Sequence, residues 1–267
     1  MTALEEMNLI YGIRLILIPS SEFYMGRLPL DREYPILTDP VKKSIEKSFW
    51  MSDTPITNRQ YASYLDDANK PIPTYTIEHW DFSWVKVNGF DKYLLENPNA
   101  PLVGVNYKDA SAFISWLTTK SNLAIRFPTE AEFEYASKAD CSCKYYCQKA
   151  VNIKKSLRDY GEPSNKKVPS VKRYEANSFK LFDMQGLIWQ WCSDWFWPLE
   201  NVKNLNPKDP HEKPSYTPWK GHNLSPGRVI RGGSFNYSVL HSRCSSRHYT
   251  NENDRNFNLG FRIAANL

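Results

Sequence analysis

Apolar residues along this chain form short runs broken by turn residues, and few segments carry helix signals. One segment has an apolar face at helical spacing after Asn106 or Asp109, formed by Ala110, Phe113, Ile114 and Leu117. Thr57 can cap a second helix to about residue 66, and Thr129 opens a third, to about residue 138. The rest reads as short strands and long ordered loops, which predicts an α+β fold.

The C-terminal part of the chain has a different pattern. Val229 and Ile230 precede a double glycine, and residues 259–263 alternate apolar and other residues at strand spacing. Between these brackets, residues 236–258 are rich in Asn, Ser, His and Tyr, which favour turns and local hydrogen bonds over core packing. We expect residues 231–235 and 259–263 to be paired or adjacent central strands that display a polar, aromatic recognition surface.

These brackets and the blocks upstream resemble the formylglycine-generating enzyme, or sulfatase-modifying factor, family. Residues 126–136 read RFPTEAEFEYA, nearly the family's RLPTEAEWEYA, and 231–235 with 258–262 resemble its C-terminal hallmark. Further matching blocks lie, in the family's order, at residues 18–26, 54–61, 101–110 and 182–195. The resemblance covers about residues 10–264 and implies a loop-rich variant of the C-type lectin fold with few short helices.

Composition supports one domain spanning residues 1–267, with 41% hydrophobic residues to fill a core. The net charge of +5 is small and spread out, so we do not expect nucleic-acid binding. The sequence has no apolar run long enough for a membrane span, and residues 10–18 do not form a secretory signal. We therefore expect a cytoplasmic protein, or an exported one if a leader has been removed.

Five cysteines are present, and three of them crowd together at Cys141, Cys143 and Cys147. They form either a metal clip or a set of reduced thiols in a loop. Structural zinc takes four ligands, and no fourth ligand lies beside them, so thiols are the simpler interpretation.

The enzyme that names the family uses two cysteines to bind copper. The resemblance places Tyr237 and Ser242 at these positions, and neither supplies the soft thiolate that Cu(I) prefers. Cys244 lies close by, without a partner at the family's spacing. The family's calcium ligands, an Asn and a Glu, are matched here by Leu187 and Gln190. We therefore expect no copper, calcium or other cofactor, and no catalytic residues at these positions.

Another branch of the family, the variable proteins of diversity-generating retroelements, uses the same brackets for recognition. In that branch, adenine-directed mutagenesis rewrites Asn codons, and the altered side chains line one shallow pocket. The resemblance implies ligand-binding residues at positions reachable from Asn, which here are Asn236, Tyr237, Ser238, Leu240, His241, Ser246, His248, Tyr249, Thr250, Asn251, Asn253, Asn256, Phe257 and Asn258. Fixed arginines can anchor such a loop through forked hydrogen bonds, namely Arg243, Arg247, Arg255 and Arg262.

Three functions stay open: a binder diversified by a retroelement, a non-diversified binding or scaffold relative, and a metal-dependent oxidoreductase with an altered site. We favour the first, with a protein or peptide as partner, because stiff aromatic side chains suit such contacts. The expected patch is concave and partly exposed, with Asn251, Asn256 and Asn258 at its margin and Tyr237, His241, His248, Tyr249 and Phe257 within it.

Overall fold

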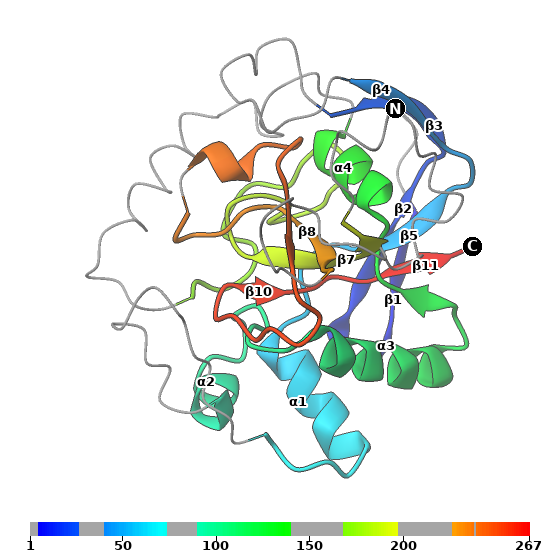
Figure 1. The fold of residues 1–267 in the computed structure, drawn as a ribbon. Helices are drawn as coiled ribbons and strands as arrows, with labels where there is room; N and C mark the ends of the chain where they lie inside the picture. The colour runs from blue at the N-terminus through cyan, green and yellow to red at the C-terminus, as the bar shows by residue number, and fades with distance from the viewer. Residues whose placement is uncertain (1–4, 27–39, 74–89, 140–167, 197–225, 238) are drawn as a thin grey trace.

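The computed structural model describes residues 5–26, 40–73, 90–139, 168–196, 226–237 and 239–267 (Figure 1). Its largest sheet has five strands in the order β1-β2-β5-β11-β6. Their bounds are β1 Glu6–Asn8, β2 Arg14–Ile18, β5 Phe49–Ser52, β11 Ala264–Asn266 and β6 Ile125–Arg126. Both β2 and β11 pair antiparallel with β5, so segments from the two ends of the sequence meet in one sheet.

A four-stranded sheet carries the C-terminal segment, in the order β10-β7-β8-β9. Its strands are β10 Leu259–Gly260, β7 Trp189–Trp195, β8 Arg228–Arg231 and β9 Arg247–Thr250. β10 runs parallel to β7, and the other two pairings are antiparallel. A separate ribbon pairs β3 Ser21–Met25 with β4 Val41–Ile45.

The helices begin where their capping residues predict. α1 Asn58–Asp67, α3 Tyr107–Ser121 and α4 Glu130–Lys138 each follow a capping box, with Thr57, Asn106 and Thr129 as N-caps. The short helix α2 Phe90–Glu96 was not predicted. Within the described part of the chain, none of the helices has the length and apolar character needed to cross a membrane.

The central strands are buried on both faces, between two apolar clusters. Leu15, Trp191 and Ile230 belong to the cluster that packs on α1 and α3. Their sequence neighbours Ile16, Cys192 and Val229 belong to the cluster that packs on α4. Because side chains alternate across a strand, a strand covered on both sides carries a continuous apolar run rather than an alternating one. Together these features give the mixed α+β fold that the sequence predicts.

The two bracketing strands lie in the same sheet, but β7 separates them, so they are not paired with each other. β8 ends at Arg231, and residues 232–235 form a turn instead of continuing the predicted strand. Gly233 has a φ of 69°, and a Cβ there would lie 2.6 Å from the His241 carbonyl oxygen. The double glycine therefore lets the C-terminal segment close tightly against the turn.

Candidate functional site

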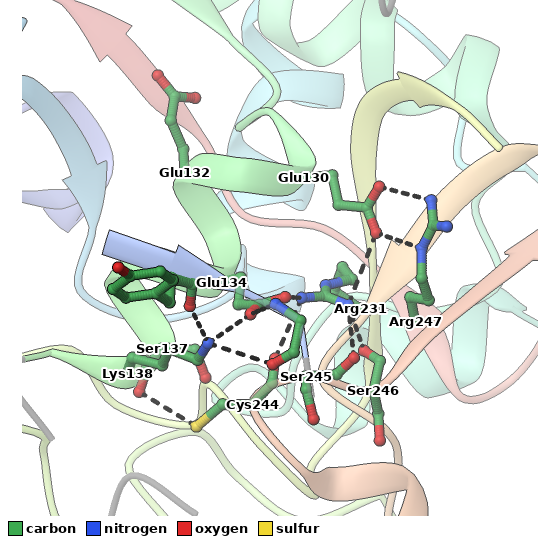
Figure 2. A network of polar contacts seen from close by, with 12 residues as sticks. Glu130, Glu132, Glu134, Ser137, Lys138, Arg231, Cys244, Ser245, Ser246 and Arg247 are labelled. Atoms are coloured by element: carbon green, nitrogen blue, oxygen red, sulfur yellow. Dashed lines mark hydrogen bonds and ion pairs between the residues drawn. The ribbon is translucent and has the colours of Figure 1, made fainter. Parts of the chain in front are cut away.

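Arg231 binds the backbone in the middle of the C-terminal segment (Figure 2). Its guanidinium is fully buried and donates to the carbonyls of Cys244, Ser245 and Ser246 at 3.1, 3.2 and 2.8 Å. It also donates to the Glu134 carboxylate on α4. One planar donor group thus fixes three successive backbone carbonyls of an irregular stretch to a helix.

The first turn of α4 holds β9 in the same way. Arg247 forms a bidentate pair with Glu130, with both nitrogen–oxygen distances at 2.8 Å. Burial alone would raise the pKa of Glu130, but the charges of Arg247 and Arg231 outweigh burial and hold the pKa below its ordinary value. Lys138 completes the network through its ion pair with Glu134 at 2.6 Å. The ion pairs that Arg231 and Arg247 form with α4 are called the arginine frame below.

Arg255 and Arg262 tie down the end of the segment. Arg255 donates to the Asp109 carboxylate on α3, and the amide of Gly104 donates to the Asn256 carbonyl at 3.0 Å. Arg262 is fully buried and donates to the Ser52 and Phe182 carbonyls at 3.0 and 2.8 Å. Arg243, the remaining predicted anchor, is also buried.

Three side chains, two partly exposed and one exposed, gather on one buried tryptophan. Trp189 lies in T-shaped or tilted contact with the rings of Tyr237, His241 and His248, at centroid distances of 5.8, 6.4 and 5.7 Å. Tyr237 and His241 also contact each other at 5.3 Å. These four residues, the Trp189 cluster, come from β7, the turn after β8, the 3₁₀ helix η3 Val239–Ser242 and β9. Large, stiff rings are thus brought together at the surface, where a ligand could contact them.

The polar residues that flank the cluster in the sequence are ordered by local hydrogen bonds. Asn236 accepts from the Ser234 hydroxyl at 2.7 Å and from the side chain of Asn258 at 2.9 Å. The amide of Asn251 donates to Asp254 at 3.0 Å, and the amide of Asn253 donates to the Asn251 side chain at 3.0 Å. Other partly exposed predicted positions in this loop are Thr250 and Asn256. Asn residues here stabilise turns, as their sequence context suggests.

Three predicted ligand-binding residues are buried, contrary to expectation. Phe257 is 0% exposed and packs against Phe235 at a ring distance of 5.8 Å, so its predicted exposure is wrong. Asn258 is 4% exposed and Ser246 7%, and both are held by the hydrogen bonds given above. A ligand on the folded surface cannot reach these side chains.

Tyr249 is partly buried, and its ring contacts the His248 ring of the Trp189 cluster at 5.9 Å. Its ring stacks on Phe196 at 4.5 Å and packs against the cluster of apolar residues under α4. It faces the fold rather than solvent because it follows His248 on β9, where successive side chains alternate. Of the other predicted residues, Ser238 lies outside the residues that the structure describes. For Leu240 the structure describes only the backbone, which belongs to η3.

The positions of the family's copper ligands hold other chemistry. Tyr237 belongs to the Trp189 cluster, and Ser242 is fully buried. Burial raises the pKa of the neighbouring Cys244 to about 11, and its sulfur accepts from the Gln185 amide at 2.7 Å. Cys244 is thus packed in the core, where its sulfur takes part in a hydrogen bond.

At the calcium-type position, the side-chain amide of Gln190 uses both of its ends. Its nitrogen donates to the Asp183 carbonyl at 3.2 Å, and its oxygen accepts from Arg262 at 2.6 Å. Leu187, the other altered position, is buried in the core. Cys141, Cys143 and Cys147 lie outside the described residues, among which no group of three or more metal-ligating side chains occurs.

Sequence reasoning missed two parts of this site. Glu130 and Glu134 stand four residues apart on α4 and therefore face the same side, which is a readable signal for paired cations. The other part is Trp189, a core residue that is 3% exposed and yet supports the exposed rings. Its second role depends on the path of the chain after Gly233 and has no signal in the sequence.

The fold and the positions of its signature residues define a C-type-lectin-like protein of the formylglycine-generating type. The sequence model of the sulfatase-modifying factor enzyme 1-like domain matches residues 9–267, and the chain belongs to this family. A relative in Streptomyces coelicolor, named formylglycine-generating enzyme, is 25% identical over 92% of this chain and 87% of its own length. The serine/threonine-protein kinase pkn1 of Chlamydia pneumoniae is 28% identical over 95% of this chain. The match spans 38% of that kinase's length.

Solved structures show the same fold. PvdO from Pseudomonas aeruginosa superimposes with a TM-score of 0.76 and 20% identity, covering 98% of both chains. Treponema denticola variable protein 1 superimposes with a TM-score of 0.68 and 21% identity over 100% of both chains. This chain thus shares its fold with PvdO and with a variable protein.

Proposed function

We propose that this chain is a ligand-binding protein whose C-terminal segment presents the Trp189 cluster to a partner. The observation that carries the proposal is the convergence of three partly exposed rings, Tyr237, His241 and His248, on one buried indole. The arginine frame supports this surface from α4. Its charges are used internally, so the frame positions the segment while the rings stay available.

A protein or peptide is the partner that fits this surface. Tyr and His rings offer contact area with few rotatable bonds, so little conformational entropy is lost on binding. Energetically dominant contacts at protein interfaces are enriched in Tyr and Trp that lie near the centre of the patch. Asn236, Asn251 and Asn253 would form the adaptable polar margin of the contact.

We further propose that a retroelement diversifies this surface. Tyr237, His241, His248 and the exposed or partly exposed Asn residues stand at positions reachable from Asn codons, and the family resemblance implies fixed arginines such as Arg247. The fold shared with Treponema denticola variable protein 1 agrees with this proposal. Sequencing the neighbouring DNA is the test. A reverse transcriptase gene and a near-copy of the 3′ coding end, differing mainly at adenines, are expected. A locus without both would leave a non-diversified binder.

Binding itself is tested with peptides displayed on phage and selected against the whole immobilised chain. Selected peptides should lose at least about tenfold in affinity for the double variant Tyr237→Ala, His248→Ala, because the two ring contacts together contribute more than about 1.4 kcal/mol. Tyr24→Ala is the matched control, since Tyr24 is an exposed tyrosine on β3 outside the cluster. Equal loss in the control, or none in the double variant, would reject the proposed surface.

The second candidate is a metal-dependent oxidoreductase with an altered site, and the similarity to formylglycine-generating enzymes favours it. Tyr237 and Ser242 at the copper positions speak against it, as do Leu187 and Gln190 at the calcium-type positions. We expect the purified chain to hold no stoichiometric copper or calcium. Elemental analysis with about one copper per chain, together with aldehyde formation on a cysteine-containing peptide, would establish the enzyme instead.

A further inference from the structure

A polar cleft of about 510 Å³ opens where η1 Ile10–Gly12, the first turns of α1 and the loop around Lys172 meet. None of its lining residues belongs to the Trp189 cluster or the arginine frame. Its volume falls within the range of about 300–1,000 Å³ that is common for small-molecule sites. The lining is mainly polar, with hydroxyl and amide side chains such as Thr54, Thr57, Gln60 and Asn99.

Positive charge exceeds negative charge among the lining residues. Arg14, Arg59 and Lys172 face one carboxylate, that of Asp53. Arg14 is already paired with Glu6 at 2.5 Å. Arg59 is exposed, and its side chain forms no hydrogen bond or ion pair with any residue that the structure describes. The cleft therefore holds an uncommitted guanidinium, which is suited to a carboxylate or a phosphate.

Asp53 provides the cleft with a negatively charged hydrogen-bond acceptor. It is 4% exposed, and two hydrogen bonds fix its backbone. Its amide donates to the Arg14 carbonyl at 2.9 Å, and its carbonyl accepts from the Phe182 amide at 2.7 Å. Its Oδ2 lies 3.1 Å from Lys172 Nζ but accepts no aligned hydrogen bond from the described residues. A buried carboxylate oxygen without an aligned hydrogen bond is costly, so a donor on a ligand would stabilise it.

The rim of the cleft is rigid although its backbone is strained. Tyr11 has a φ of 59°, in the left-handed region that a tyrosine seldom adopts. Its ring stacks on Trp116 at 5.4 Å, and its hydroxyl donates to Asp67 at 3.2 Å. On the floor, Gln60 Nε2 donates to the Gly12 carbonyl at 3.4 Å. Strained residues held in this manner concentrate at ligand sites.

We propose that this cleft binds a small anionic sugar, with its acid group on Arg59 and Lys172 and a hydroxyl donating to Asp53. The positive surplus selects the acid group, and the hydroxyl and amide lining suits the remaining hydroxyls. Carboxylate and phosphate share the chemistry that Arg59 recognises, so both a sugar acid and a sugar phosphate are candidates. The site is independent of the Trp189 cluster.

Isothermal titration of the whole chain with glucose 6-phosphate, glucuronate, glucose and inorganic phosphate tests the proposal. At least one of the two anionic sugars should bind at millimolar concentration, and more tightly than glucose or inorganic phosphate. The preferred sugar identifies the acid group. Failure of both anionic sugars to bind, or equal binding of glucose or inorganic phosphate, would overturn the proposal.

Substitutions in the cleft test whether the sugar binds there. Arg59→Gln should weaken the preferred sugar by about tenfold or more, since a charge-assisted hydrogen bond contributes about 1.5–3 kcal/mol. Asp53→Asn should weaken the sugar, because its hydroxyl loses an ionised acceptor, whereas inorganic phosphate should bind at least as tightly as to the parent chain, because a negative charge beside Lys172 is removed. Lys172→Gln serves in its place if Asp53→Asn fails to fold, with tenfold weaker sugar binding expected. Lys92→Gln on α2, an exposed lysine outside the cleft, is the matched control and should bind normally. Unchanged binding in Arg59→Gln would reject the site.

Discussion

The C-terminal segment contains two regions that differ in how they are held. Residues 242–246 are buried, and the backbone carbonyls of residues 244–246 accept hydrogen bonds from the Arg231 guanidinium. Tyr237, His241 and His248, on either side of this stretch, are partly or fully exposed and contact Trp189 through ring edges and tilted faces. One region is held by hydrogen bonds to its backbone, the other by side-chain contacts at the surface.

This difference separates stability from recognition. Backbone carbonyls are the same for every residue type, so Arg231 can hold the segment whatever side chains it carries. The Trp189 cluster, by contrast, depends on the identity of its rings. Substitution at Tyr237, His241 or His248 should therefore change what is bound, while substitution in the arginine frame should change whether the chain folds.

The largest effect is expected from Arg231→Ala. The substitution removes the guanidinium that donates to the Glu134 carboxylate and to three carbonyls. Removing one partner of a buried ion pair costs about 3–5 kcal/mol. Urea denaturation monitored by circular dichroism measures the loss.

Lys92→Ala provides the control for this prediction. Lys92 pairs with Glu96 at 3.9 Å on the exposed face of α2, and such surface pairs contribute less than about 1 kcal/mol. A loss for Arg231→Ala no larger than that of Lys92→Ala would show that the arginine frame does not stabilise the segment.

The second prediction concerns Asp183, which lies beneath the same sheet. Burial raises the pKa of Asp183 to about 6, although it accepts the amides of Arg173 and Tyr174 at 3.1 and 3.3 Å. A folded-state pKa above the unfolded value means that the folded chain holds this proton more tightly. The stabilising contribution of Asp183 is thus complete below about pH 4 and is lost as the pH rises through about 6, by about 3 kcal/mol.

Asp183→Asn isolates this titration. Because Asn does not ionise, the free energy of unfolding of the variant should gain on that of the parent chain between about pH 4 and pH 7. Any fixed cost of the lost acceptor is the same at every pH and does not affect the trend. A constant difference between the two chains across this range would mean that Asp183 titrates normally.

Local signals in the sequence predict the helices and the frame of the fold well. Thr57, Asn106 and Thr129 cap α1, α3 and α4 because a side-chain oxygen three residues before its partner amide needs no distant contact. Val229 and Ile230 of β8 likewise predict a buried strand. These features depend on neighbouring residues, and neighbours are visible in a sequence.

Burial within the C-terminal segment could not be predicted in the same way. Phe257 and His248 both lie in a polar, Asn-rich stretch, yet one is core and the other is exposed. The outcome depends on where β10 and β9 enter the sheet relative to β7, and that is set by contacts distant in sequence. The place of β7 between the two bracketing strands is another long-range feature, and it explains why they are not paired.

Tyr249→Ala should have an intermediate effect. The ring stacks on Phe196 at 4.5 Å and packs on the apolar cluster under α4, so its removal should cost about 2 kcal/mol. Urea denaturation again provides the measurement. A loss below about 0.5 kcal/mol would mean that Tyr249 is a surface residue, and it would return to the candidate ligand contacts.

The smallest effect on stability is expected from His248→Ala, one residue away on the same strand. His248 is exposed, and its ring touches the edge of the fold at Trp189, 5.7 Å between centroids, rather than filling a cavity. Exposed substitutions usually change the free energy of unfolding by less than about 0.5 kcal/mol. The same variant should bind selected peptides at least about threefold more weakly than the parent chain, because it removes one of the three rings. Stability and binding would then respond in opposite ways to Tyr249→Ala and His248→Ala. If His248→Ala destabilised the chain as much as Tyr249→Ala, the Trp189 cluster would be a continuation of the core, and the distinction between frame and surface would fail.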